Sequence, residues 1–184
     1  MTTISQSDVT IEPVVQDANV AIRYENEEER SAVRSVNVSA FERVDEADLI
    51  DRLKDEGVVL LSLVAVAGTQ VIGHILFSRM WIDTEDGPLS AVALAPMAVL
   101  PEHQRQGLGG RLIRCGLDWL QDRGEQIVIV LGHPDYYPRF GFSPEKARTL
   151  ESPFPPHAFM VTELSVNALA GICGRVRYPA AFGL

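Results

Sequence analysis

The chain has 184 residues, of which 46% are hydrophobic and 22% are charged, a composition typical of a globular protein with a sizeable core. Its 25 acidic and 16 basic residues give a formal net charge of −9, which argues against a general nucleic-acid-binding protein. The longest apolar run, around residues 58–67, is too short to cross a bilayer. We therefore expect a cytoplasmic protein with neither a nucleic-acid nor a membrane partner.

The N-terminal segment is polar and has no hydrophobic periodicity. It also lacks the basic and apolar regions of a secretory signal peptide. We predict a flexible leader over residues 1–18 and a single domain over residues 19–184.

The predicted elements begin with a strand over residues 20–24, where apolar and polar side chains alternate. Asn26 followed by Glu29 resembles a capped helix start, and a helical face then continues to Phe41. Acidic residues from Asp45 onward predict the start of a second helix. Gly57 is a plausible end for it.

Three apolar runs follow, separated by turn-forming residues. They read VVLLSLVAVAG, QVIGHILFSRMWI and SAVALAPMAVL. Gly68-Thr69 is a hairpin signal between the first two runs, and DTEDGP is a polar turn between the second and the third. The sequence therefore predicts three consecutive antiparallel strands.

A helix and a parallel strand are predicted next. Leu108, Leu112, Cys115 and Trp119 follow helical spacing and form a core stripe, and Gly124 ends the helix. The short apolar run QIVIVLG is typical of a buried strand parallel to its predecessor, so the unit is a crossover connection.

The two cysteines, Cys115 and Cys173, are too few for a disulfide scaffold or a zinc site. We interpret Cys115 as a small buried apolar residue, and we expect no metal site.

Gly107, Gly109 and Gly110 lie where the predicted helix begins. The first turn of a helix has backbone N–H groups without partners and a partial positive charge, so it binds anions, and glycines let a phosphate approach closely. The pattern is not a Walker A loop, because no Lys-Ser/Thr pair follows, and it is a poor dinucleotide fingerprint. On the glycines alone, a plain strand-to-helix turn stays open as an alternative.

Pro96 interrupts the preceding predicted strand. Proline cannot donate to a strand ladder, so it indicates an edge, a bulge or a splay. A splayed strand leaves backbone groups of Met97 and Val99 free for an extended ligand whose phosphates lie on the following helix. The pantetheine arm of coenzyme A has this chemistry, because it is an amide-bearing chain that ends in a pyrophosphate.

These residues resemble the GNAT N-acetyltransferases over about residues 20 to 184. Gln104 to Gly109 (QRQGLG) is similar to the family's acetyl-CoA signature, Gln/Arg-x-x-Gly-x-Gly/Ala. Tyr137 precedes a Gly-Phe pair by four residues, as in a later element of the family. Within the superfamily, LGHPDYYPRFGF and the C-terminal segment resemble the YhbS-like predicted acetyltransferases.

The resemblance implies a mixed α/β fold with a mostly antiparallel central sheet, splayed at the fourth strand, and helices on both faces. It implies acetyl-CoA as co-substrate, an amine acceptor, and Tyr137 as the general acid that protonates the coenzyme A thiolate. The cofactor-binding residues that it implies are Met97, Ala98, Val99, Gln104, Arg105, Gln106, Gly107, Leu108, Gly109 and Gly110.

The general base is open on sequence grounds. His133 follows a buried strand and is our candidate, with a structural turn histidine as the alternative. Arg111 and Arg114 share a helix face, and they either meet the outer phosphate of coenzyme A or are simply solvated.

The expected function is acetyl transfer from acetyl-CoA to a primary amine of a small molecule or a protein. A non-catalytic acyl-CoA-binding sensor on the same fold is the alternative. The apolar, proline-containing C-terminal tail also leaves a homodimer open.

Overall fold

The computed structural model describes residues 15–17 and 19–184. The helices are α1 (Arg30–Phe41), α2 (Asp45–Asp55) and α3 (Leu108–Asp122), with short 3-10 turns η2 (Glu27–Glu29), η3 (Pro101–His103), η4 (Tyr137–Phe140) and η5 (Ala180–Phe182). The strands are β1 (Val15–Asp17), β2 (Val20–Tyr24), β3 (Val59–Ala67), β4 (Gln70–Thr84), β5 (Gly87–Val99), β6 (Ile127–Leu131), β7 (Leu150–Glu151), β8 (Phe159–Glu163) and β9 (Gly174–Arg177). Most of the predicted leader lies outside the described residues; its residues 15–17 form β1, which pairs with β2.

The described strands form one mixed, mostly antiparallel sheet in the order β1-β2-β3-β4-β5-β6-β8, and β9 pairs with both β4 and β7. The predicted succession of three antiparallel strands, β3, β4 and β5, is confirmed. The crossover is confirmed as well, because β6 pairs in parallel with β5 after α3. The expected fold class is therefore correct.

The local signals of the sequence explain where the helices begin and end. The backbone N–H of Asn26 donates to the Glu29 carboxylate at 2.9 Å, as the predicted cap requires. Helix α2 begins at Asp45. Gly57 and Gly124 follow α2 and α3 with positive φ angles of 72° and 78°, the left-handed conformation that glycine adopts without steric cost.

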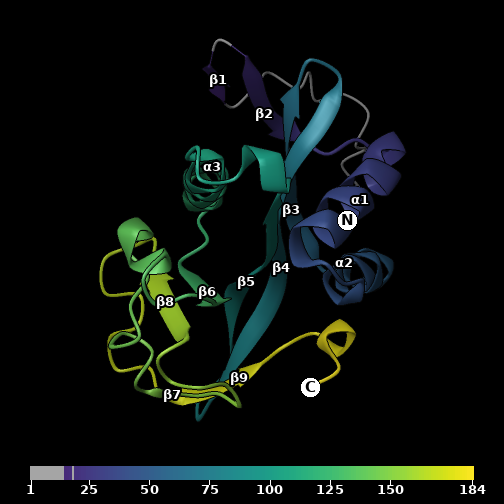
Figure 1. The fold of residues 1–184 in the computed structure, drawn as a ribbon. Helices are drawn as coiled ribbons and strands as arrows, with labels where there is room; N and C mark the ends of the chain where they lie inside the picture. The colour runs from purple at the N-terminus through teal and green to yellow at the C-terminus, as the bar shows by residue number, and fades with distance from the viewer. Residues whose placement is uncertain (1–14, 18) are drawn as a thin grey trace.

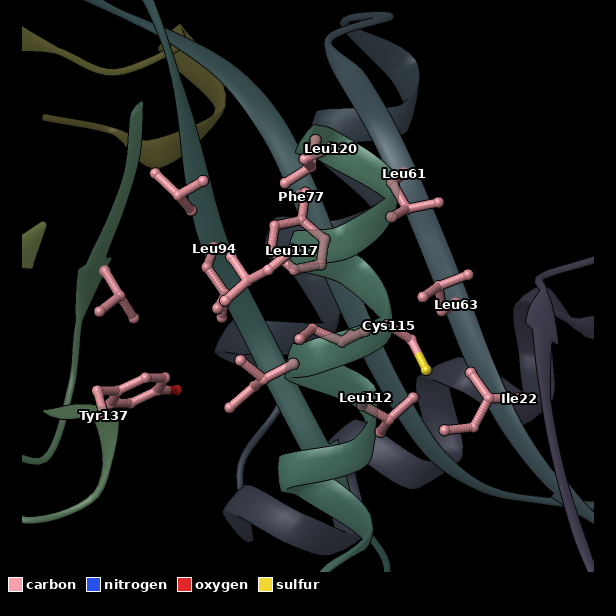
Figure 2. Packing of buried hydrophobic residues seen from close by; sticks show 14 of the residues in the cluster. Ile22, Leu61, Leu63, Phe77, Leu94, Leu112, Cys115, Leu117, Leu120 and Tyr137 are labelled. Carbon is pink, nitrogen blue, oxygen red and sulfur yellow. The ribbon is translucent and has the colours of Figure 1, made fainter. Parts of the chain in front are cut away.

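Helices cover both faces of the central strands: α1 and α2 lie on one side and α3 on the other (Figure 1). Helix α3 packs Leu112, Cys115 and Leu120 against the sheet (Figure 2). Gly116 allows close contact there, because a Cβ atom at this position would lie 2.2 Å from the Phe77 ring. Cys115 is 4% exposed, which confirms its interpretation as a core residue.

The splay predicted from Pro96 occurs between β5 and β6. Their parallel ladder runs only over Val92–Leu94, whereas β5 continues along β4 to Val99. The β4–β5 register also shifts opposite Leu76, so Ala95 and Pro96 together face a single residue. Beyond Leu94, therefore, one edge of β5 has no neighbouring strand in the described part of the chain.

The C-terminal segment packs on its own chain. Strand β9 pairs with β4, and the 3-10 turn η5 lies against α2 (Figure 1). Apolar residues of the tail thus have packing partners within the same chain, and the homodimer stays a prediction. Among the residues described, no helix combines the length and the apolar character needed to cross a membrane.

Candidate functional site

A cavity of about 950 Å³ opens where β5 and β6 separate. Segments far apart in the sequence line it: the end of β5, the start of α3, the η4 turn, helices α1 and α2, and the C-terminal segment. The predicted site residues in its lining are Met97, Ala98, Val99, Gln104, Arg105, Gly107, Leu108, Gly109, Gly110, His133 and Tyr137. Gln106 does not line it; its side-chain amide donates to the Glu102 carbonyl at 3.0 Å.

The free edge of β5 presents alternate backbone groups to this cavity. The N–H of Leu100 donates to the carbonyl of Ile72 in β4 at 3.0 Å. Because backbone groups alternate in direction along an antiparallel strand, those of Ala98 also face β4, whereas those of Met97 and Val99 face the open edge. Gln104 holds this end of the strand, since its side-chain amide donates to the Val99 carbonyl at 2.9 Å.

The turn between β5 and α3 exposes backbone N–H groups. Arg105 and Gly107 have positive φ angles of 60° and 83°. The first helical hydrogen bond of α3 joins the N–H of Arg111 to the carbonyl of Gly107 at 3.1 Å. The N–H groups of the three residues between them, 108–110, therefore precede the helical ladder and lie at the positive end of the helix dipole. This arrangement suits an anion.

Glycine is needed at positions 107, 109 and 110 for different structural reasons. Gly107 is required by its left-handed φ angle, and no atom lies within 4 Å of the Cβ position. A Cβ atom on Gly109 would lie 2.8 Å from the Tyr136 hydroxyl, and one on Gly110 would lie 3.2 Å from the Phe140 ring. Gly109 and Gly110 thus let the η4 segment approach the helix, a packing reason that sequence reasoning missed.

Three arginines line the cavity without a carboxylate partner in the described part of the chain: Arg105, Arg114 and Arg139. The Arg114 guanidinium lies 5.2 Å from the Phe140 ring centroid, and that of Arg139 lies 4.4 Å from the Tyr136 ring centroid. In a chain of net charge −9, this local excess of positive charge favours an anionic ligand. Arg111 points elsewhere, since its guanidinium donates to the Val20 carbonyl at 3.2 Å.

Tyr137 extends from the segment after β6 toward β5 and α3, with its hydroxyl leading (Figure 2). Its ring packs on Gly132, where a Cβ atom would lie 2.2 Å away, and meets Phe142 edge-on at a centroid distance of 5.7 Å. Burial, together with the neighbouring Tyr136, raises the pKa of Tyr137 far above that of a free phenol. The phenol is therefore protonated at neutral pH and can donate a hydrogen bond or a proton.

His133, after β6, and Glu46, in α2, also line the cavity. His133 is exposed, and its backbone carbonyl accepts hydrogen bonds from the N–H groups of Tyr136 and Tyr137 at 3.0 and 3.3 Å. Glu46 is the only carboxylate in the lining, as far as the structure describes the chain. The guanidinium of Arg43 donates to both of its carboxylate oxygens.

The fold and the cavity together define the architecture of the GNAT type: a splayed mixed sheet, a crossover helix with a glycine-rich first turn, and a tyrosine that lines the same cavity. Residues 22–142 match the model of the acetyltransferase (GNAT) family, and the chain belongs to that family.

Among particular relatives, the chain is similar to two uncharacterized N-acetyltransferases of Escherichia coli. It is 49% identical to YjhQ over 117 residues, which are 62% of this chain and 64% of YjhQ. It is 38% identical to YhbS over 146 residues, which are 78% of this chain and 86% of YhbS. The match thus spans slightly less than two thirds of YjhQ and most of YhbS.

Solved structures extend the similarity to the whole fold. The E. coli YhbS structure, a complex with CoA, has a TM-score of 0.84 at 34% identity and covers 92% of this chain and 95% of its own. A GNAT acetyltransferase from Brucella melitensis, in complex with acetyl-CoA, has a TM-score of 0.76 at 32% identity, over 90% of this chain and 99% of its own. The chain is thus a YhbS-like member of the GNAT family.

Proposed function

We propose that this protein transfers the acetyl group of acetyl-CoA to a primary amine of a small molecule or a protein, by direct attack of the amine on the thioester. One observation carries the proposal: a single cavity joins the glycine turn before α3, the open edge of β5 and the ring of Tyr137. The CoA and acetyl-CoA complexes of the two similar structures support the choice of donor.

In this proposal the pyrophosphate lies on the backbone N–H groups of residues 105–110. Arg114 and Arg139 add positive charge at the same place, because both line the cavity and have no carboxylate partner in the described part of the chain. The pantetheine arm lies along β5 and pairs with backbone groups of Met97 and Val99. The N–H of Met97 faces the thioester and stabilises the negative charge that develops on its carbonyl oxygen.

The chemistry needs one bond formed and one broken. The neutral amine nitrogen attacks the thioester carbon, a C–N bond forms, the C–S bond breaks, and the thiolate of coenzyme A leaves. His133 is the proposed base that takes the proton from the amine nitrogen. The Tyr137 hydroxyl donates a hydrogen bond to the departing thiolate.

The raised pKa of Tyr137 shapes its proposed role. A thiol has a pKa of about 8.5 and a free phenol one of about 10, so full proton transfer to the thiolate is already uphill. Burial increases that difference. Tyr137 therefore acts by donating a hydrogen bond that stabilises the developing thiolate, and solvent supplies the proton later.

The test follows free coenzyme A with a thiol reagent while acetyl-CoA is mixed with a panel of primary amines. Cys173 is exposed and would react with the reagent, so the assay uses a Cys173→Ser background; buried Cys115 stays. We expect thiol release that depends on both enzyme and amine, and a product heavier by one acetyl group. Binding of acetyl-CoA without turnover of any amine would instead support the acyl-CoA sensor.

A further inference from the structure

The side of the cavity formed by α1, α2 and the C-terminal segment differs chemically from the side with the arginines. We call this side the acceptor wall, and its residues are Phe41, Glu46, Leu49, Phe154, Tyr178 and Phe182. Five of the six are apolar or aromatic, and one is a carboxylate. No arginine or lysine of the described residues lines the cavity on this side.

The aromatic part of the acceptor wall is a packed unit. Phe154 meets Tyr178 edge-on at a centroid distance of 5.7 Å, and Tyr178 meets Phe182 at 4.8 Å. These residues come from the segment before β8 and from the C-terminal segment after β9. Their rings are half-buried, so each has one side in the core and another toward the cavity.

Helix α2 fixes the C-terminal part of this wall. The Glu56 carboxylate accepts hydrogen bonds from the N–H groups of Ala180 and Ala181 at 3.2 and 2.8 Å. Arg52 donates from Nε to the Ala181 carbonyl at 2.9 Å. Phe182, one residue further on, is thereby held against the cavity (Figure 1 shows η5 beside α2). A fixed apolar wall selects ligands by shape and by apolar surface.

Glu46 is the one negatively charged group of the acceptor wall. Its side chain is 15% exposed, and both of its oxygens accept hydrogen bonds from Arg43, whose side chain is 60% exposed. A carboxylate has about four acceptor sites, so the pair with Arg43 leaves sites for an ammonium group. A positively charged amine is repelled by the arginines opposite and attracted to this carboxylate.

We propose that the acceptor is a small amine with an apolar body, alkyl or aryl, whose ammonium group first binds Glu46 and whose body contacts the rings of the acceptor wall. The bound ammonium then loses one proton to solvent, and the neutral amine attacks the thioester. This inference rests on the proposed acetyl transfer and names its acceptor class. Polyamines and amino acids are disfavoured, because a second ammonium would lose its hydration with no second carboxylate in the acceptor wall to bind it, and a carboxylate would face Glu46.

The first test compares linear alkylamines of increasing length with a polyamine and an amino acid, at saturating acetyl-CoA. Burial of one methylene corresponds to about a fourfold gain, so kcat/KM should rise by about that factor per carbon until the wall is covered. Phe182→Ala should remove most of this gain and leave the KM for acetyl-CoA unchanged. Leu184→Ala, at an exposed position of the same tail, is the matched control and should change neither.

The second test separates a binding role of Glu46 from a structural one. Glu46→Gln should raise the KM for alkylamines about tenfold, whereas Arg43→Gln, which frees the carboxylate, should lower it or leave it unchanged. If both variants raise the KM equally, Glu46 serves only its pair with Arg43, and the inference is wrong.

Faster acetylation of the polyamine, or turnover that is independent of chain length, would also overturn the inference while leaving acetyl transfer intact. Failure of the proposed function looks different, because acetyl-CoA would then not bind, as measured by calorimetry without any amine.

Discussion

Tyr137 is the residue on which the proposed chemistry depends most. Tyr137→Phe removes the hydroxyl and retains the ring that packs on Gly132 and Phe142. We expect kcat to fall about 100-fold, at the lower end of the usual range for an acid catalyst, with the calorimetric Kd of acetyl-CoA unchanged. An unchanged kcat would show that the Tyr137 hydroxyl does not stabilise the thiolate.

His74 carries a second residue-scale prediction, which concerns stability. Its Nδ1 lies 3.2 Å from the Asn37 side-chain nitrogen, its Nε2 lies 2.9 Å from the Ser62 hydroxyl, and that hydroxyl donates to Glu25 at 2.5 Å. Complete burial, with the positive charge of nearby Lys54, lowers the pKa of His74 to about 3.

In the unfolded chain this histidine therefore binds a proton below its ordinary pKa of about 6.5, whereas in the folded chain its imidazole stays neutral. The contribution of neutral His74 to the free energy of unfolding is complete above pH 6.5 and is lost as the pH falls toward 3. The free energy of unfolding then changes by at most about 1.4 kcal/mol per pH unit. Urea unfolding from pH 8 to pH 4 measures this. His74→Gln should flatten the slope; an equal slope in the variant would assign the pH dependence to groups other than His74.

At the scale of elements, two of the glycines in helix α3, Gly109 and Gly116, differ in what their replacement would do. Gly116→Ala places a Cβ atom against the buried Phe77 ring, so we expect it to lower the free energy of unfolding by about 1–3 kcal/mol. Gly109→Ala meets only the ends of the Tyr136 and Met97 side chains, which can shift.

We expect Gly109→Ala to raise the KM for acetyl-CoA with little loss of stability, and Gly116→Ala to do the reverse. Thermal melting and steady-state kinetics on both variants measure this difference. If Gly109→Ala changes stability alone, the turn is purely structural, which is the alternative left open by the sequence.

The elements and the cofactor side of the cavity were predictable because their signals are local. Gly68 indicates the β3–β4 hairpin, Pro96 indicates the splay of β5, and the glycines of residues 107–110 indicate the tight turn. Each signal depends on backbone chemistry within a few residues.

The acceptor wall was not predictable in the same way. Phe41 is more than a hundred residues from Phe154 and Phe182 in the sequence, and only the fold brings the three to one cavity. Arg114 and Arg139 likewise lie near each other because both contact the Phe140 ring, and their spacing in the sequence does not predict this. Such sites depend on tertiary packing. Aromatic residues near the C-terminus are as typical of an ordinary hydrophobic core as of a ligand-binding wall, so the sequence does not distinguish the two.

At the scale of the whole molecule, the distribution of charge distinguishes the cavity. Elsewhere many arginines pair with carboxylates: Arg30 and Arg34 of α1, for example, bind Asp48 and Asp51 of α2 at 2.6–2.8 Å. Such exposed pairs contribute little to stability, but they neutralise the arginines concerned. Arg105, Arg114 and Arg139 are left to attract an anion into the cavity.

Calorimetric titration of acetyl-CoA tests this account most directly, with the wild type, Arg114→Gln and Arg148→Gln compared at one salt concentration. Arg148 is exposed and outside the cavity, so its variant removes the same charge from another place. We expect one site per chain, an affinity at least tenfold lower for Arg114→Gln, and an unchanged affinity for Arg148→Gln. Absence of binding to the wild type, or equal losses in both variants, would contradict the assignment of this cavity to acetyl-CoA.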